Sequence, residues 1–340
     1  MDRDLIAKID ARSSLSRTEA ESVMEQVLEG HLSEEQIMRL LVGLREKGET
    51  VDELVGFARA LRRHAEPIFT TRARPNGIIL DTCGTGGDAS GIFNVSTAVA
   101  FVAAGAGVRV AKHGNRSISS KSGSADVLEA LGISMEISPA RAGEAIAEVG
   151  IGFLFAPAVH KAVRHAMTAR QKIATRTVFN LLGPLTNPAG ATAQLAGVFP
   201  ESAVAKIAHA LAELGVARAF VVHGLDGLDE ISLSVETLVA EVKAGAVRTY
   251  RVQPEDFGLH IEPREALLGG DAQTNARILR AVLGGERSAK RNLVIANASA
   301  ALVAAGAAPD FREGARVAAQ AIDSGAALAK LDALTAFLRN

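Results

Sequence analysis

The chain has 340 residues, of which 48% are hydrophobic and 22% charged, a composition typical of a soluble globular protein long enough for two domains. Its 37 lysines and arginines nearly balance 38 aspartates and glutamates, which excludes the general basic excess of nucleic-acid-binding proteins, so we expect no nucleic-acid partner. The single cysteine excludes an internal disulfide, and neither a signal peptide nor a run of about 18 apolar residues is evident, so we expect a cytoplasmic protein with no membrane partner.

Roughly the first 65 residues are predicted to be helical throughout. Three helix starts carry a capping-box pattern, in which Glu or Gln follows a hydroxyl residue three positions later: Ser16 with Glu19, Ser33 with Gln36, and Thr50 with Glu53. Pro67 and the sequence Arg74-Pro-Asn-Gly77 then interrupt the pattern. We therefore place an all-helical N-terminal domain at residues 1–70.

Beyond Gly77, short apolar strands alternate with helices. We predict strands at residues 78–80, 108–110, 152–155, 194–199 and 219–222, and helices at 96–106, 124–131, 203–214 and over most of the tail after 275. This alternation predicts an α/β domain, residues 71–159 and 183–340, whose mostly parallel central sheet is flanked by helices. Residues 160–182 are predicted to be helical and to pack on the N-terminal domain.

A glycine-rich loop, Asp81-Thr-Cys-Gly84-Thr-Gly86-Gly87-Asp88, follows the first expected strand. Three glycines in four positions let an anion approach the backbone N–H groups, and the following helix N-terminus favours negative charge. The loop lacks the Gly-Lys-Ser/Thr of a P-loop, and Ala89 replaces the last glycine of the dinucleotide fingerprint. The loop alone is compatible with a phosphate site or with a tight turn.

Two further polar segments are expected at the same edge of the sheet. Asn94-Val-Ser-Thr97 opens the helix at 96–106, where its side chains suit either helix caps or a pyrophosphate. Lys112-His-Gly-Asn-Arg-Ser-Ile-Ser-Ser120 follows the strand at 108–110. Because ligands of open α/β sheets bind beyond the carboxyl ends of the strands, two such loops together indicate a diphosphate site.

Adjacent carboxylates, Asp229 and Glu230, lie in the loop after the strand at 219–222, with Asp226 nearby. Such a pair is compatible with a solvated acidic turn. Beside a phosphate site it also suits Mg²⁺, which prefers oxygen ligands and commonly bridges carboxylates to substrate phosphates.

Fewer conclusions follow from the remaining polar residues. Arg170 suits either a surface charge or a bidentate clamp for a carboxylate. His160 suits a structural histidine. Cys83 has no evident partner base and no zinc-ligand spacing, so nucleophilic and zinc mechanisms have no support.

The chain resembles the anthranilate phosphoribosyltransferases over essentially its whole length. The resemblance rests on the order of five segments: Gly84-Thr-Gly-Gly-Asp88, Asn94-Val-Ser-Thr97, Lys112-His-Gly-Asn-Arg-Ser117, the run at 170–188, and Asp229-Glu230. It implies a Mg²⁺-dependent homodimeric enzyme of tryptophan biosynthesis. Such an enzyme transfers the 5-phosphoribosyl group from phosphoribosyl pyrophosphate to the amine of anthranilate and releases pyrophosphate.

The resemblance also implies residue roles. For the donor it implies Gly84, Gly87, Asp88, Asn94, Val95, Ser96, Thr97, Lys112, His113, Gly114, Asn115, Arg116, Ser117, Ile118, Ser119, Ser120 and Ser124. For anthranilate it implies Gly84, Asn115, His160 and Arg170, and for the metal Ser96, Asp229 and Glu230. Lys112 would stabilise the transition state by its charge, and Arg170 would hold the anthranilate carboxylate.

This chain departs from the family pattern at a few positions. Ile92 replaces a threonine that would contact the donor. Thr168-Ala169 replaces Pro-Val before Arg170, and Ile173-Ala174 replaces the Leu-Gly that follows. Most of these changes lie beside Arg170, so they concern the acceptor site more than the donor site.

Three other functions remain open at this stage. One is a pyrimidine-nucleoside phosphorylase of similar fold, and another is a transferase for a different aromatic acid. The third is a non-catalytic homologue that binds a nucleotide or nucleic acid. The Lys112–Arg116 segment favours the amine-accepting family, and the Asp229-Glu230 pair favours an enzyme.

Overall fold

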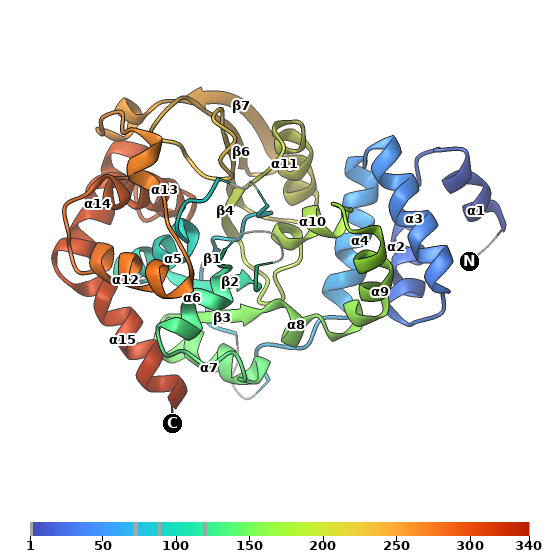
Figure 1. Ribbon diagram of the computed structural model, residues 1–340, viewed down its shortest axis with the longest axis horizontal. Helices are drawn as coiled ribbons and strands as arrows, with labels where there is room; N and C mark the ends of the chain where they lie inside the picture. Colours follow the sequence, from blue (N-terminus) through green and yellow to red (C-terminus); the bar gives the residue numbers. More distant parts are fainter. Residues whose placement is uncertain (1–2, 71–73, 88–89, 118–120, 340) are drawn as a thin grey trace.

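The computed structural model describes residues 3–70, 74–87, 90–117 and 121–339. A small helical unit lies beside a larger unit built around one sheet, and helix α1 (Arg3–Asp10) lies at the outer end of the helical unit (Figure 1). The roles predicted for Asp88, Ile118, Ser119 and Ser120 concern positions outside the described residues. No helix in the described part of the chain has both the length and the apolar character needed to cross a membrane.

The helical unit begins with the helices predicted from the capping boxes. The helices are α1 (Arg3–Asp10), α2 (Arg17–Leu28), α3 (Glu34–Lys47) and α4 (Val51–Arg63). In α2, α3 and α4 the hydroxyl of Ser16, Ser33 or Thr50 accepts from the third helical N–H, and the Glu or Gln side chain accepts from the cap N–H. The three predicted capping boxes are therefore confirmed.

The segment at 160–182, predicted to be helical, is divided into separate short helices. It contains α9 (Arg164–Ile173) and α10 (Phe179–Leu182), preceded by the short α8 (Ala156–Val159). Helix α9 packs against α2 and α3, and it ends where Ala174 adopts a left-handed conformation (φ 51°). The Ala174 N–H bonds the Arg170 carbonyl, which closes the last turn and redirects the chain. The domain boundary near residue 70 stays a prediction.

Seven strands form one sheet in the order β3-β2-β1-β4-β5-β6-β7. Strands β1 to β5 run parallel, and β6 and β7 extend the sheet as an antiparallel hairpin that sequence analysis missed. The strands are β1 (Ile79–Asp81), β2 (Arg109–Gly114), β3 (Ile151–Phe155), β4 (Ala193–Gly197), β5 (Arg218–Gly224), β6 (Thr237–Lys243) and β7 (Ala246–Val252). The mostly parallel sheet flanked by helices is confirmed, and β2 runs four residues beyond its predicted end at 110.

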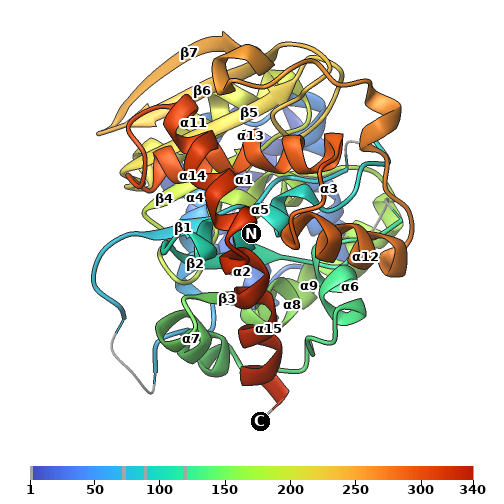
Figure 2. The same ribbon diagram turned by 90° about the vertical axis from the view of Figure 1, so that its left-hand side faces the viewer.

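Helices cover both faces of the sheet, and Figure 2 shows the C-terminal helices, in orange to red, from the side on which they cover it. The remaining α-helices of the described residues are α5 (Val95–Gly105), α6 (Ser124–Ala130), α7 (Pro139–Glu148), α11 (Val204–Glu213), α12 (Ala272–Leu283), α13 (Ala289–Ala304), α14 (Phe311–Asp323) and α15 (Ala326–Arg339). Short 3₁₀ helices are Lys161–Val163, Gly183–Leu185, Glu201–Ala203, Pro254–Phe257 and Arg264–Leu267.

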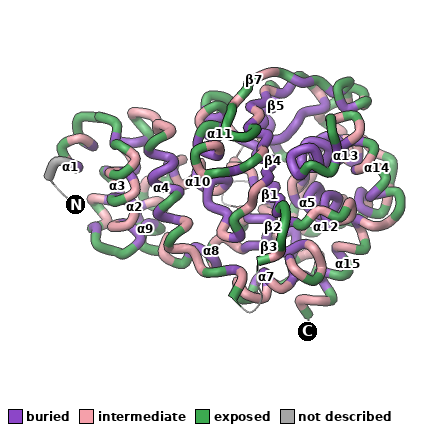
Figure 3. The backbone as a smooth tube through the Cα atoms, turned by 180° about the vertical axis from the view of Figure 1, so that it is seen from behind, coloured by how far each residue is buried: buried purple, intermediate pink, exposed green. Residues whose placement is uncertain are grey.

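Alternate strand residues enter different cores, as the two-residue period of a strand requires. Leu80, Val110 and Leu195 pack with α5, α13 and α14. Ala196 and Val221, on the opposite face, join the core of the helical unit through α11. Figure 3 shows buried residues concentrated along the strands and α5. The sheet is therefore fixed from both sides, and its carboxyl edge is held rigidly.

The left-handed Ala174 provides a test of backbone strain. A Cβ in this region is unfavourable and glycine is the usual residue, so we expect Ala174→Gly to raise the free energy of unfolding by about 0.5–1 kcal/mol. Ala329→Gly, at an exposed position inside α15, should lower it by about 1 kcal/mol, because glycine disfavours a regular helix. Urea unfolding of both variants measures the difference, and equal losses would contradict the assignment of strain.

Candidate active site

Three segments predicted to bind a diphosphate and its metal meet beyond the carboxyl ends of β1, β2 and β5. The Gly86 N–H donates to Asp229 Oδ2 at 2.9 Å, and the Ser96 N–H donates to Glu230 Oε1 at 3.2 Å. Lys112 Nζ donates to Ser96 Oγ at 3.1 Å. The glycine loop, the start of α5 and the acidic pair therefore form one site.

Close backbone contacts explain two glycines of this site. A Cβ on Gly197, at the end of β4, would lie 1.6 Å from the Asp229 carbonyl oxygen. A Cβ on Gly84 would lie 3.1 Å from the Gly197 carbonyl oxygen and 3.2 Å from Asp229 Oδ2. Thr85 fixes the loop from the other side, since its N–H donates to the Gly197 carbonyl at 2.8 Å. Glycine lets the acidic pair approach the end of β4 closely.

Lys112 is a buried residue of β2, not a loop residue as the sequence predicted. Its ammonium donates to the Thr82 carbonyl at 2.8 Å as well as to Ser96 Oγ. Only 4% of the residue is exposed, and burial lowers the pKa of Lys112, while nearby acidic groups oppose that shift. These two oxygens hold the ammonium next to the start of α5, so its positive charge lies on the interior side of the site.

Burial also controls the other titratable groups beneath the loops. Burial raises the pKa of Asp81 to about 6, although its Oδ1 accepts from the His113 N–H at 3.1 Å. Burial raises the pKa of the Cys83 thiol far above its usual range, so the thiolate nucleophile is absent at neutral pH. This result agrees with the absence of support for a nucleophilic mechanism.

The start of α5 is linked to the second polar loop. Asn94 does not cap the helix: its Nδ2 donates to the Ser122 carbonyl at 3.0 Å, and its Oδ1 accepts from Asn275 Nδ2 at 3.0 Å. Ser124 Oγ donates to the Asn115 carbonyl at 3.2 Å. A Cβ on Gly114 would meet Ser124 Oγ at 2.3 Å. The structure thus brings together the two segments that were predicted to surround the donor.

The other residues predicted to bind the phosphoribosyl donor differ in the burial and in the partners of their side chains. Val95 and Thr97 are buried, so the helix start presents its backbone and Ser96. Arg116 pairs with Glu129 at 2.6 Å and with Asp126 at 3.2 Å, and these carboxylates raise the pKa of its guanidinium. The Ser117 N–H donates to Asp126 at 3.0 Å. The Arg116 guanidinium is therefore engaged by two carboxylates of α6.

Arg170 and His160 lie toward the helical unit. Arg170, on α9, has its Cζ 4.8 Å from the Phe179 ring centroid and is partly buried, which lowers the pKa of its guanidinium. The His160 ring meets the His113 ring edge-on at 5.1 Å, and burial lowers the pKa of His113 to about 3 and that of His160 to about 4. The two imidazoles are therefore neutral at pH 7.

The oxygen ligands at this site fit Mg²⁺. Ser96 Oγ, Asp229 and Glu230 supply hydroxyl and carboxylate oxygens around one helix start. The described residues hold no group of three or more His, Cys, Asp or Glu arranged as a complete metal cage. Two carboxylates and a hydroxyl suit Mg²⁺, which commonly takes one or two carboxylates and completes its shell with water and substrate oxygens.

The chain is similar over most of its length to proteins of a known family. Models of the glycosyl transferase family match the chain twice, the helical bundle domain at residues 3–65 and the a/b domain at 76–328. An anthranilate phosphoribosyltransferase of Rubrobacter xylanophilus is 54% identical, over 97% of this chain and 95% of the relative. The chain belongs to the anthranilate phosphoribosyltransferase family. The family predicted from the sequence motifs is thereby confirmed, and with it the class of enzyme.

Solved structures of this family share the fold. The anthranilate phosphoribosyltransferase of Thermus thermophilus superposes with a TM-score of 0.92 at 45% identity, covering 99% of this chain and all of that chain. The Saccharomyces cerevisiae anthranilate phosphoribosyltransferase in complex with PRPP and Mg has a TM-score of 0.89 at 26% identity, covering 100% and 99% of the chains. The comparisons thus favour the anthranilate family over the nucleoside phosphorylase alternative.

Arg176 is a site residue to which the sequence assigns no role. Its guanidinium donates to the Gly87 carbonyl, and its Cζ lies 4.2 Å from the Phe199 ring centroid. The contact joins the linker after α9 to the glycine loop, across 89 positions of the chain. No local sequence pattern predicts this contact, because the two segments are brought together only by the fold.

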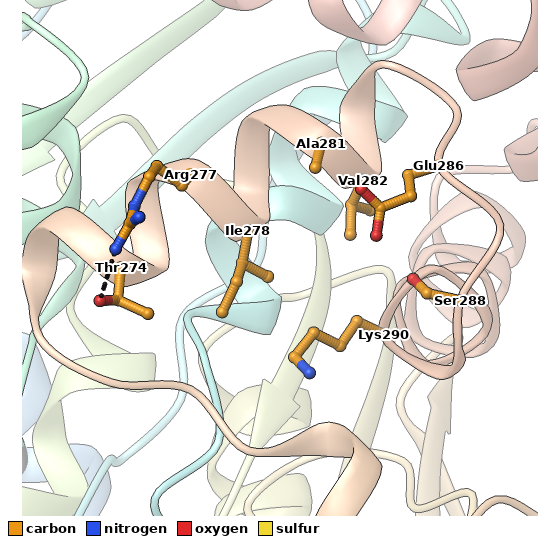
Figure 4. Close-up of a pocket in the computed structure, with 8 residues that line it drawn as sticks. All are labelled: Thr274, Arg277, Ile278, Ala281, Val282, Glu286, Ser288 and Lys290. Atoms are coloured by element: carbon orange, nitrogen blue, oxygen red, sulfur yellow. Dashed lines mark hydrogen bonds between the residues drawn. The ribbon is translucent and has the colours of Figure 1, made fainter.

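A separate pocket of about 390 Å³ lies between α12 and the start of α13 (Figure 4). Its lining residues are Thr274, Arg277, Ile278, Ala281, Val282, Glu286, Ser288 and Lys290. Arg277 donates to Thr274 Oγ1 at 3.2 Å, and Lys290 donates to the Ala266 carbonyl at 2.7 Å. The pocket shares no residue with the predicted site, so we assign the chemistry to the sheet edge.

The close contact at Gly197 predicts that alanine at this position destabilises the protein more than alanine at Gly183. We expect Gly197→Ala to lower the free energy of unfolding by about 1–3 kcal/mol, because its methyl group would displace the Asp229 backbone. Gly183→Ala is the matched control, since its Cβ would meet nothing closer than 3.9 Å. Thermal unfolding measures both variants, and a Gly197→Ala protein as stable as the control would contradict the packing described.

Proposed function

We propose that this chain transfers the 5-phosphoribosyl group from phosphoribosyl pyrophosphate to the amine of anthranilate and releases pyrophosphate, a step of tryptophan biosynthesis. The observation that carries the proposal is the meeting of two backbone N–H groups with two carboxylates, at Gly86–Asp229 and Ser96–Glu230. The two backbone N–H groups suit a diphosphate, and the two carboxylates suit its metal. Full-length identity of 54% to a named relative supports the same activity.

The donor diphosphate is assigned to the glycine loop and the start of α5. Gly84, Gly86 and Gly87 place no side chain over the loop backbone, and Gly86 (φ 65°) and Gly87 (φ 77°) adopt the left-handed conformation that glycine favours. The N-terminus of α5, an 11-residue helix, adds N–H groups and a favourable dipole. The segment from Lys112 to Ser117, together with Ser124, would enclose the ribose phosphate.

The metal is assigned to Ser96, Asp229 and Glu230. When bound, Mg²⁺ neutralises charge on the leaving pyrophosphate. Lys112 contributes a second positive charge beside the metal site, because its ammonium donates a hydrogen bond to the Ser96 hydroxyl. Both charges therefore act where negative charge develops during the reaction.

The acceptor is assigned to the side of the site that faces the helical unit. Arg170 would hold the anthranilate carboxylate, with Gly84 and Asn115 on the donor side and His160 on the channel wall. The aromatic contact of Arg170 with Phe179 orients its guanidinium. Neutral His113 and His160 line this region without adding a charge that competes with Arg170.

The reaction needs little proton chemistry from the protein. The lone pair of the anthranilate nitrogen forms the new bond to the ribose C1, the bond from C1 to the pyrophosphate oxygen breaks, and the nitrogen then releases a proton to water. An arylamine is unprotonated at neutral pH, so no strong base is required. Catalysis then rests on positioning and on charge stabilisation of the leaving group.

We also propose that the enzyme is a cytoplasmic homodimer. The N-terminal helices are the surface on which we place the second protomer, and Met167 on α9 exposes 37% of its area there. Sedimentation equilibrium at several concentrations tests this proposal.

The direct test of the activity is depletion of anthranilate fluorescence with and without donor and Mg²⁺. We expect depletion only when both are present. Thymidine or uridine with inorganic phosphate tests the phosphorylase alternative in the same preparation, and turnover there without anthranilate depletion would replace our proposal.

Removal of charge from the metal site should reduce catalysis strongly. For Asp229→Asn combined with Glu230→Gln, we expect kcat/KM to fall by about 10²–10³, because the leaving pyrophosphate loses its charge stabilisation. Lys112→Met, which preserves burial while removing the ammonium, should cause a loss of the same order. Circular dichroism confirms folding of each variant, and near-normal activity in both would refute the assignment.

Loss of Arg170 should affect only the acceptor. For Arg170→Ala we expect the KM for anthranilate to rise by about tenfold or more, because a charge-assisted bidentate pair is lost. The KM for phosphoribosyl pyrophosphate should stay nearly unchanged. A change confined to the donor KM would show that Arg170 does not hold the carboxylate.

A further inference from the structure

We propose that Asp229 and Glu230 act as internal anions that occupy the diphosphate cradle until magnesium binds. The diphosphate cradle is the pair of backbone N–H groups of Gly86 and Ser96. The inference rests on the proposed function and concerns the regulation of the same site. In this view the two carboxylates have successive roles: they first block the backbone N–H groups of the cradle, and they then release them by turning to the metal.

The geometry shows the two blocking contacts. Asp229 Oδ2 accepts from the Gly86 N–H at 2.9 Å, on the loop assigned to the donor. Glu230 Oε1 accepts from the Ser96 N–H at 3.2 Å, in the first turn of α5. Each carboxylate oxygen therefore stands where a diphosphate oxygen would accept the same hydrogen bond.

The neighbouring residues favour this arrangement in the absence of ligand. A negative oxygen at the start of α5 is stabilised by the helix dipole, and a hydrogen bond to an ionised acceptor is stronger than one between neutral groups. Lys112 Nζ, at 3.1 Å from Ser96 Oγ, adds positive charge beneath the same helix turn. Gly197 allows the Asp229 backbone to stay within reach of the loop.

Two consequences follow for ligand binding. Without metal, a diphosphate must displace both carboxylates and approach their charges, so it binds weakly. With metal, the carboxylates turn toward the cation, the N–H groups become available, and the local negative charge is neutralised. Magnesium and diphosphate therefore promote each other's binding reciprocally, with the cradle N–H groups as the shared element.

The sharp test uses inorganic pyrophosphate without metal. Removal of a metal ligand ordinarily weakens the binding of a metal-associated anion, whereas removal of the Asp229 carboxylate should strengthen pyrophosphate binding here. In chelator-treated buffer we expect Asp229→Ala to bind pyrophosphate about tenfold more tightly than the unmodified protein, the amount expected when a charged hydrogen-bond competitor is removed. Asp229→Asn should fall between them, because a neutral amide oxygen competes less strongly. Isothermal titration calorimetry measures all three affinities.

Asp226→Asn is the matched control for charge. Asp226 lies in the same loop, but its carboxylate accepts from Ser232 Oγ at 2.9 Å, and among the described residues it makes no hydrogen bond with Gly86 or Ser96. We expect little change for this variant. Raising the salt concentration separates the remaining effects, since salt screens charge repulsion far more than it screens competition for one N–H group. The gain from Asp229→Ala should persist at about 0.5 M salt.

The outcomes distinguish the two levels of the proposal. Tighter metal-free binding by Asp229→Ala, with no comparable gain for Asp226→Asn, supports the inference. If the unmodified protein binds pyrophosphate with Mg²⁺ but Asp229→Ala gains nothing without metal, the internal-anion role is overturned and the proposed function stands. If no variant binds pyrophosphate under any condition while all remain folded, the donor site itself is wrong.

Discussion

The hydrogen bond from the Gly86 N–H to Asp229 joins segments 143 positions apart and defines the site on which the rest of the structure converges. It forms because both segments follow parallel strands of one sheet, so their loops emerge at the same edge. Burial of the sheet on both faces holds that edge in place. The candidate site therefore rests on a rigid apolar frame.

Positive and negative groups of the site lie in successive layers from the buried strand β2 outward. Lys112 lies lowest, inside β2, and its ammonium is held by the Thr82 carbonyl and the Ser96 hydroxyl. The backbone N–H groups of Gly86 and Ser96 lie above it, and the carboxylates of Asp229 and Glu230 accept from them. Positive and negative groups thus alternate before any ligand arrives, which limits the cost of burying Lys112.

Much of this arrangement follows from local sequence. The capping boxes, the glycine loop and the alternation of strands and helices are each determined by neighbouring residues, and each was predictable. The limits of β2 were not, because Lys112 and His113 look like loop residues until tertiary partners satisfy them. The β6–β7 hairpin turns at Ala244-Gly245, where both residues have positive φ as a two-residue hairpin turn requires, but only the glycine is a residue typical of such turns. The Arg176–Gly87 contact had no local signal, since it arises only from the fold.

The break at Ala174 also affects how the two units are connected. The chain leaves the helical unit after α4, builds three strands of the sheet, returns through α9 to pack on α2 and α3, and then crosses back at the left-handed residue. The helical unit is thus discontinuous in sequence, and its packing is complete only after more than half of the chain has been synthesised. A fragment that stopped near residue 70 would expose the apolar surface that Ala166 and Ala169 cover. The helical unit and the sheet unit are therefore connected by repeated crossings of the chain as well as by packing.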